Sequence, residues 1–278
     1  MKRVIIVHRW EGGSHDDWRP WLKSELEKLG YEVQVPDMPD TDVPVIDKWV
    51  SKLTEVVGTP DVNTYFVGHS IGCQTILRYL ETIDTPVGGA VFVAGWFNLD
   101  NMEDEDVKEI ARPWIETPID LAKVKSILQV ATLIISENDP YGCLEENKQR
   151  FSEVMTKGIV IPNAGHFTTE DGYTEMPLVV DELKGFLAPD ILKLRLKKEG
   201  FSHVFDWHDE PNTEYPEHSH RGKVSFYVLK GSVTFFGEIN STVNSGERFD
   251  VPVGVKHSAI VGPDGCDWIV GEEIEGDS

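Results

Sequence analysis

Ser70 stands in the segment GHSIG, where Gly68 and Gly72 flank it two positions away on either side. The apolar run over residues 65–67 predicts the end of a buried strand, and apolar residues at helical spacing over 76–83 predict that a helix follows at once. So short a connection is a sharp turn, which favours glycines because a side chain would collide with strand or helix. Two interpretations fit: a nucleophile elbow that lifts a serine hydroxyl to the sheet edge, or a tight strand–helix connection with an incidental serine.

A nucleophilic serine needs a base and a carboxylate that orients the base, and in α/β sheets of this kind they follow in the order serine, acid, histidine. The segment LIISENDPYG places Asp139 just after a predicted strand, and VIPNAGHF places His166 after the next one. Each residue has a simpler interpretation, since Asp139 precedes a proline in a common turn opener and His166 could be a surface loop residue. The three positions, taken together in this order, favour catalysis.

The elements that must position these residues alternate between strand and helix. Amphipathic helices are predicted over 21–29, 71–83, 144–157 and 177–187, between apolar strands over 3–8, 32–36, 64–69, 89–96, 131–138 and 158–162. Short apolar strands separated by amphipathic helices predict an α/β fold with a mostly parallel sheet covered on both faces. Active residues of such sheets gather in loops at the carboxyl ends of the strands, where the three candidates fall.

The remainder of the chain has a different pattern. From about residue 200, helical spacing gives way to short alternating runs separated by Gly, Asn, Asp and Pro. This pattern predicts an antiparallel sheet closed as a barrel or jelly roll. We therefore expect an α/β unit over residues 1–189 and an all-β unit over residues 190–278, with the boundary at Pro189.

The composition narrows the partners and the compartment. Lys and Arg number 26 against 48 Asp and Glu, so the formal net charge is −22, which disfavours nucleic acid and anionic membrane surfaces as partners. The first apolar run is too short for a signal peptide or a membrane span. The three cysteines are odd in number and far apart, which suggests reduced thiols. We expect a cytoplasmic protein.

Five segments together resemble the small serine hydrolases related to retinoblastoma-binding protein nine. They are HRWEGGSHDDWRPWLKSELEKLGYEVQVPDMPDTDVP, FVGHSIGCQTILRYL, AVFVAGWF, SENDPYG and PNAGHF, and the resemblance covers about residues 1–189. It implies a compact α/β-hydrolase fold without a large lid domain, and a catalytic triad. In that triad Ser70 is the nucleophile, His166 the general base and acid, and Asp139 the residue that orients the imidazole.

The same resemblance implies an oxyanion hole formed by the backbone N–H groups of Trp10 and Ile71. The first strand commonly leads into His-Gly in this superfamily, whereas this chain has His8-Arg9. Trp96 and Phe97 end the strand that follows the Ser70 helix. They are candidates to line an acyl or leaving-group pocket, and packing is the alternative.

Two segments of the all-β part, EHSHRGKVSFYVLKG and SGERFDVPVGVKHSAIV, resemble the two cupin motifs. His218 and His220 alternate on one strand and so face the same side, where His257 is expected to meet them. Three neutral imidazoles with open positions suit zinc, iron, nickel or copper. Val224 occupies the usual glutamate position, which removes one anionic ligand. The alternative is a degenerate cupin whose histidines line a polar pocket.

The leading hypothesis is a carboxylesterase-like serine hydrolase that cleaves a small ester, thioester or amide through an acyl-enzyme. The cupin would bind a metal or small ligand, or help the chain form a homodimer. A second hypothesis is a catalytically weak interaction module with a cupin metabolite sensor, and Arg9 is the feature that favours it. A third is an isomerase or dioxygenase centred on the cupin, and Val224 argues against it.

Overall fold

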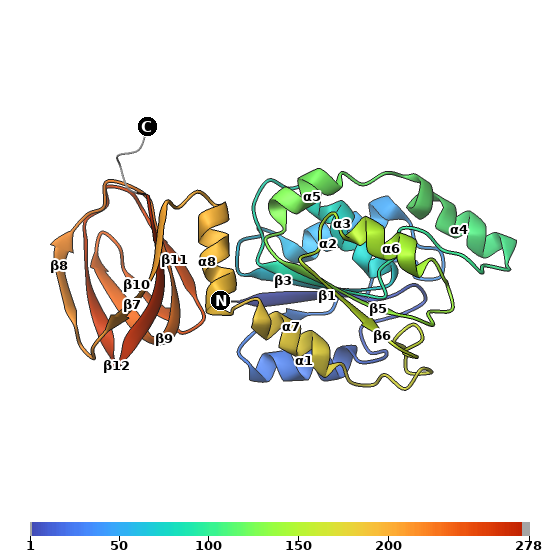
Figure 1. Cartoon of the computed structure of the whole chain (residues 1–278), viewed down its shortest axis with the longest axis horizontal. Helices are drawn as coiled ribbons and strands as arrows, with labels where there is room; N and C mark the ends of the chain where they lie inside the picture. The colour runs from blue at the N-terminus through green and yellow to red at the C-terminus, as the bar shows by residue number, and fades with distance from the viewer. Residues whose placement is uncertain (1, 274–278) are drawn as a thin grey trace. The chain divides into compact units, whose positions relative to one another are not determined.

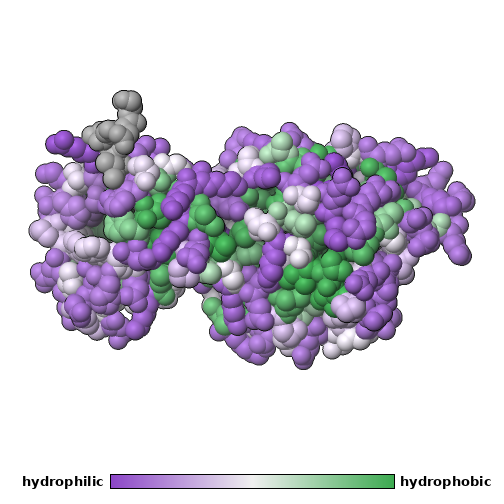
Figure 2. All heavy atoms as spheres, viewed as in Figure 1, coloured by the Kyte–Doolittle hydropathy of each residue, from purple (hydrophilic) through white to green (hydrophobic). Residues whose placement is uncertain are grey.

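The computed structural model describes residues 2–273, and the chain divides into two compact units between Lys184 and Gly185. Each unit is built from its own elements around its own core. Figure 2 shows hydrophilic residues over much of the visible face of both units, which agrees with the strongly charged composition. No helix in the described part of the chain is both long and apolar enough to cross a membrane.

The N-terminal unit is a six-stranded parallel sheet with the strand order β2-β1-β3-β4-β5-β6. Its strands are β1 (Arg3–Val7), β2 (Glu32–Gln34), β3 (Thr64–His69), β4 (Gly89–Val93), β5 (Ala131–Ser136) and β6 (Lys157–Ile161). The central strands β3, β4 and β5 are buried along their whole length. Strands covered on both faces read as continuous apolar runs, which is why they could be recognised from the sequence.

Helices cover both faces of this sheet. They are α1 (Arg19–Lys28), α2 (Ile46–Val57), α3 (Ile71–Leu80), α4 (Glu105–Glu116), α5 (Leu121–Ile127), α6 (Leu144–Phe151) and α7 (Pro177–Gly185). Figure 1 shows α1 and α7 on one face, and α2, α3, α5 and α6 on the other. The expected α/β-hydrolase architecture is therefore confirmed.

The C-terminal unit is an antiparallel β structure with one helix. It consists of α8 (Pro189–Lys198), β7 (His203–Asp209), β8 (Glu214–His218), β9 (Val224–Gly237), β10 (Ser241–Asn244), β11 (Arg248–Val251) and β12 (His257–Glu272). The main sheet has the order β10-β9-β12-β7, while β11 pairs with β9 and β8 with β12. This confirms the expected antiparallel β fold of the C-terminal unit.

Buried and exposed side chains alternate along β9, and the buried ones contribute to the core of this unit. Phe226, Val228 and Phe235 are buried in one cluster, whereas the neighbouring Phe236 is 42% exposed. Successive side chains of a strand point to opposite faces, so one face of β9 forms this core, while the other is covered by α8 at Tyr227 and meets solvent at Phe236. The helix α8 was not expected from the sequence; its Leu192 and Leu196 pack in a separate buried cluster against the sheet.

Candidate functional site

Ser70 is the single residue between β3 and α3, and its backbone is strained, with φ 57° and ψ −123°. A Cβ on Gly68 would lie 2.8 Å from the backbone nitrogen of Cys73, and a Cβ on Gly72 would collide with the carbonyl of Val7. Only glycine fits at both positions. The turn therefore requires the two glycines for the reason that the sequence suggested, and it leaves Ser70 at the carboxyl end of β3.

The hydroxyl of Ser70 lies next to the indole of Trp96. The Trp96 Nε1–H donates to Ser70 Oγ over 3.2 Å, and both side chains are buried. Among residues 2–273, Trp96 and not His166 is the hydrogen-bond partner of this hydroxyl. Since an indole only donates, the hydroxyl keeps its own proton free for another acceptor.

His166 and Asp139, which come from the loops after β6 and β5, are in direct contact. The distance between His166 Nδ1 and Asp139 Oδ2 is 2.8 Å, and the two side chains are 9% and 11% exposed. An ionised carboxylate only accepts, so the imidazole proton is on Nδ1 and Nε2 keeps its lone pair. The other oxygen, Asp139 Oδ1, accepts from the Tyr141 backbone N–H, which fixes the carboxylate. This pair can work as an oriented base.

The loop that carries His166 is held by hydrogen bonds at several points. Asp171 Oδ2 accepts from the backbone N–H of His166 at 2.8 Å and from that of Thr168 at 3.1 Å. The indole N–H of Trp18 donates to the Phe167 carbonyl over 3.0 Å. Trp18 is fully buried and also orients this loop.

His69 connects the same loop to the interior. His69 Nε2 lies 2.8 Å from the His166 carbonyl oxygen, and Arg19 Nη1 lies 3.2 Å from His69 Nδ1. Arginine has no acceptor, so Nδ1 of His69 must accept and Nε2 must carry the proton that goes to the carbonyl. Burial, together with the nearby His166 and Arg19, holds the pKa of His69 well below its usual value. The ring is therefore neutral, in one tautomer.

Asp17 balances the buried charge beside His69. Its Oδ2 lies 3.0 Å from Arg19 Nη2 and 3.0 Å from Arg9 Nε, and its Oδ1 accepts from the Thr169 backbone N–H at 2.9 Å. Burial alone would raise the pKa of Asp17, but the Thr169 N–H and the two guanidinium groups bring it down to about 2. This network could not be predicted from the sequence, because nothing in the segment HDDWR indicates which charges are buried.

The two expected oxyanion donors are backbone groups at the end of β1 and the start of α3. In the described part of the chain, the N–H groups of Trp10 and Ile71 have no hydrogen-bond partner. Arg9, which replaces the usual glycine, has no positive φ; the positive φ of this turn belongs to Glu11, at 52°. The Arg9 side chain instead joins the Asp17 network, so the replacement is accommodated without backbone strain at that position.

The structure places the two aromatic candidates differently. Trp96 contacts Ser70, as described above, whereas Phe97 lines a separate cavity of about 200 Å³ together with Arg78 and Trp114. The Phe97 ring packs on Phe151, with 4.8 Å between ring centroids. Trp96 is therefore in contact with the Ser70 hydroxyl, whereas Phe97 lines this second cavity and packs on Phe151.

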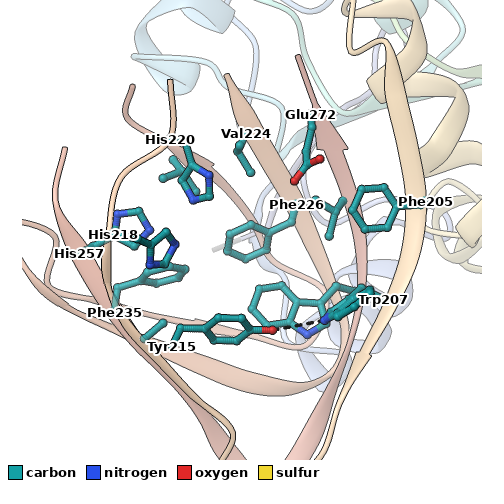
Figure 3. A pocket seen from close by; sticks show the side chains of 14 residues that line it. Phe205, Trp207, Tyr215, His218, His220, Val224, Phe226, Phe235, His257 and Glu272 are labelled. Carbon is teal, nitrogen blue, oxygen red and sulfur yellow. Dashed lines mark hydrogen bonds between the residues drawn. The ribbon is translucent and has the colours of Figure 1, made fainter. Parts of the chain in front are cut away.

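The three histidines of the C-terminal unit meet on one wall of a cavity of about 290 Å³ (Figure 3). Ligand atoms of His218, His220 and His257 all lie within 4.8 Å of one another. His218 Nδ1 is 2.8 Å from the Pro216 carbonyl and His257 Nδ1 is 3.0 Å from the Val255 carbonyl. These carbonyls accept, so both rings carry their proton on Nδ1 and keep the Nε2 lone pair for a ligand.

Val224 faces this cavity where the cupin motif usually has a glutamate, as the sequence indicated. The structure adds a carboxylate that the motif comparison missed. Glu272 on β12 is the register partner of Val224 on β9, and Figure 3 shows its carboxylate beside Val224 in the same cavity. Only strand pairing reveals this neighbour, because 48 positions separate the two residues in the sequence.

Comparison with known proteins agrees with this geometry. The serine hydrolase family matches residues 4–185. The chain belongs to this family. A curated relative, the putative hydrolase YdeN of Bacillus subtilis, is 26% identical over 191 residues, which are 68% of this chain and 98% of YdeN. The serine hydrolase RBBP9 of Rattus norvegicus is 24% identical over 190 residues, covering 67% of this chain and 96% of that protein.

Solved structures match both units. The crystal structure of YdeN covers 68% of this serine hydrolase chain and 100% of its own, with a TM-score of 0.62 and 27% identity. An RmlC-like cupin from Shewanella frigidimarina covers 27% of this chain and 68% of its own, with a TM-score of 0.24 and 24% identity. The expected relationship to small serine hydrolases is thus confirmed for the N-terminal unit.

Proposed function

We propose that the N-terminal unit cleaves a small ester, thioester or amide through an acyl-enzyme formed on Ser70. The observation that carries this proposal is the Asp139–His166 hydrogen bond, which leaves Nε2 of His166 as the free base. The strained Ser70 supports it, because backbone strain of this kind is typical of functional sites. The serine hydrolase family and its relatives support hydrolysis as the reaction class.

In the proposed reaction, Ser70 Oγ attacks the acyl carbon while His166 Nε2 takes the hydroxyl proton. The negative charge on the carbonyl oxygen is stabilised by the backbone N–H groups of Trp10 and Ile71. His166 returns the proton to the leaving group, and an ester of Ser70 remains. Water, deprotonated by the same imidazole, then releases the acid and restores the serine, while Asp139 keeps the imidazole in one tautomer.

Hydrolysis of 4-nitrophenyl acetate by purified variants tests this assignment. The change His166→Ala should lower kcat by roughly 10⁶-fold, and Asp139→Asn by roughly 10⁴-fold, because the acid only orients and stabilises while the base moves the proton. His15→Ala is a matched control, since His15 is exposed and belongs to the same unit. Activity that survives His166→Ala would remove His166 as the base.

We propose further that the C-terminal unit binds one divalent transition metal through His218, His220 and His257. The donor set fits, because the two Nδ1 protons are already bonded to carbonyls and the opposite nitrogens are left for a metal. Zinc, iron, nickel and copper all accept three imidazoles with open positions. Such a metal would supply a Lewis acid that holds an oxygen ligand in the cavity.

Metal analysis of the purified chain after incubation with zinc tests this second proposal. We expect one equivalent in the wild type, and a loss of binding in His218→Ala and His257→Ala. His208→Ala is the matched control, because this exposed histidine of the same unit pairs with Asp267 and lies outside the cluster. If zinc uptake is unchanged in His218→Ala and His257→Ala, the histidines do not bind metal and only line a polar pocket.

A further inference from the structure

The cavity beside the three histidines is lined mainly by aromatic and apolar side chains. Phe226, Phe235 and Trp268 line it from the core side, and Figure 3 shows Phe205 and Trp207 on the wall opposite the histidines. A volume of about 290 Å³ is at the small end of ligand pockets. Rings at several orientations offer both faces and edges, which is the environment that a flat aromatic ring prefers.

Trp207 is unusual because the residue is 51% exposed and yet its indole N–H is held by hydrogen bonds. Its Nε1–H lies 3.2 Å from both Asp209 Oδ1 and the Tyr215 hydroxyl oxygen. The Tyr215 hydroxyl donates to the buried Asp209 carboxylate over 2.7 Å. Burial and this carboxylate raise the pKa of Tyr215 to about 12, so it remains a donor. The polar network therefore presents a preorganised aromatic surface that is only half covered by protein.

Among the described residues, the free polar groups of the cavity are mostly acceptors, although a neutral His220 imidazole keeps one N–H. The donors of Trp207 and Tyr215 are used within the network just described, and the indole nitrogen of Trp268, although it has no hydrogen-bond partner in the described part of the chain, is buried away from the cavity surface. Nε2 of His218 and Nε2 of His257 carry lone pairs, and Glu272 adds a carboxylate. Within residues 2–273, neither lysine nor arginine lines this cavity. An anionic ligand would therefore have no cationic side chain to meet there.

These features select a ligand with an aromatic ring and a hydrogen-bond donor. An aromatic ammonium and an aromatic hydroxyl both qualify, but an ammonium carries a charge and three protons, which the lone pairs of two neutral imidazoles satisfy only in part, whereas a hydroxyl needs a single acceptor. We propose that this cavity binds a small phenolic compound, with its ring against Trp207 and its hydroxyl directed to the Nε2 atoms of His218 and His257. The inference rests on the proposed ligand-binding role of the C-terminal unit and is independent of the serine chemistry.

Isothermal titration of the full chain, freed of metal by dialysis against EDTA, tests the proposal with simple probes. We expect 4-methylphenol to bind, and 4-methylanisole to bind at least threefold more weakly because its ether oxygen has no proton to donate. Cyclohexanol keeps the hydroxyl but lacks a π face and should also bind at least threefold more weakly. Benzoate should bind worst, because none of the described lysines and arginines lines the cavity to balance its charge.

Two variants locate the binding site. Trp207→Leu removes the aromatic surface and should weaken 4-methylphenol by roughly five- to tenfold. Phe236→Leu is the matched control, because Phe236 is an exposed aromatic of β9 that does not line the cavity, and it should leave the affinity within twofold.

The inference would be overturned if 4-methylphenol gave no heat of binding, or if cyclohexanol bound with the same affinity. It would also be overturned if benzylamine, added as the aromatic ammonium probe, or benzoate bound more tightly than 4-methylphenol. Equal losses of 4-methylphenol affinity in Trp207→Leu and Phe236→Leu would overturn it as well. Zinc uptake, measured on the same sample, keeps the two proposals separate. Zinc binding without phenol binding would reject this inference alone. Phenol binding without zinc binding would reject the metal proposal and support this one.

Discussion

Arg19 donates to Nδ1 of His69 over 3.2 Å, so this buried charge places the ring proton of His69 on Nε2, which faces the carbonyl of His166. The side chain of Arg19 is fully buried, and its charge is balanced by Asp17. The neutral tautomer of His69 then donates to the His166 carbonyl. The position of the proposed base therefore depends on residues that never reach the substrate.

Replacing His69 tests this positioning role. His69→Phe fills a similar volume but leaves an Arg19 N–H and the His166 carbonyl unpaired, so the free energy of unfolding should fall by about 2–4 kcal/mol. The shifted loop should lower kcat ten- to hundredfold with little change in KM. His69→Gln keeps a donor and an acceptor, and it should recover part of kcat. A His69→Phe variant with normal kcat would show that the contact only packs the interior.

The Asp17 carboxylate makes part of the stability dependent on pH. Its folded-state pKa of about 2 lies below the ordinary value, so its contribution is complete above about pH 4 and is lost as the pH falls towards 2. This contribution is about 2 kcal/mol. The stability difference between the wild type and Asp17→Asn, measured by denaturant unfolding, should therefore shrink as the pH falls from 5 to 3. A constant difference over this range would contradict the assignment.

Much of the N-terminal unit could be predicted from the sequence, because its strands are buried on both faces and form continuous apolar runs. The sharp turn at Ser70 followed from two glycines, and the structure shows the backbone contacts that require them. The network around Asp17 and His69 could not be predicted. Its members are polar residues in ordinary-looking segments, and their burial arises only when distant loops meet.

The C-terminal unit shows a similar limit. Alternating runs predicted its strands, and the spacing of the motif predicted that His218 and His257 meet. The position of Glu272 depends on the register between β9 and β12, which the sequence does not encode locally. The helix α8 was missed because its polar residues obscure the apolar face formed by Leu192 and Leu196.

The acyl chain of the substrate should be short. The segment between β4 and β5 forms only the two short helices α4 and α5, which are too small for a lid domain with a long apolar tunnel. In a series of 4-nitrophenyl esters, kcat/KM should be highest for acetate and butyrate and should fall for decanoate and palmitate. A marked preference for the long chains would contradict this expectation.

The esterase activity should not need a metal. The proposed base is a histidine, and the proposed anion stabilisation comes from backbone donors, which leaves a metal no role in the N-terminal unit. Treatment with EDTA should remove metal from the C-terminal unit and leave hydrolysis of 4-nitrophenyl acetate unchanged. If activity disappears with EDTA and returns with zinc, the catalytic centre has been assigned to the wrong unit.

Labelling by a fluorophosphonate probe tests the central claim most directly, because the probe reacts only with an activated serine. The intact protein should be labelled, mass spectrometry of the digested product should locate the adduct on Ser70, and Ser70→Ala should abolish labelling while retaining the wild-type melting temperature. Ser14→Ala, which changes a serine of the same unit outside the proposed triad, should be labelled like the wild type. Labelling that persists in a folded Ser70→Ala variant, or an intact protein that does not react at all, would contradict the assignment of Ser70 as the nucleophile.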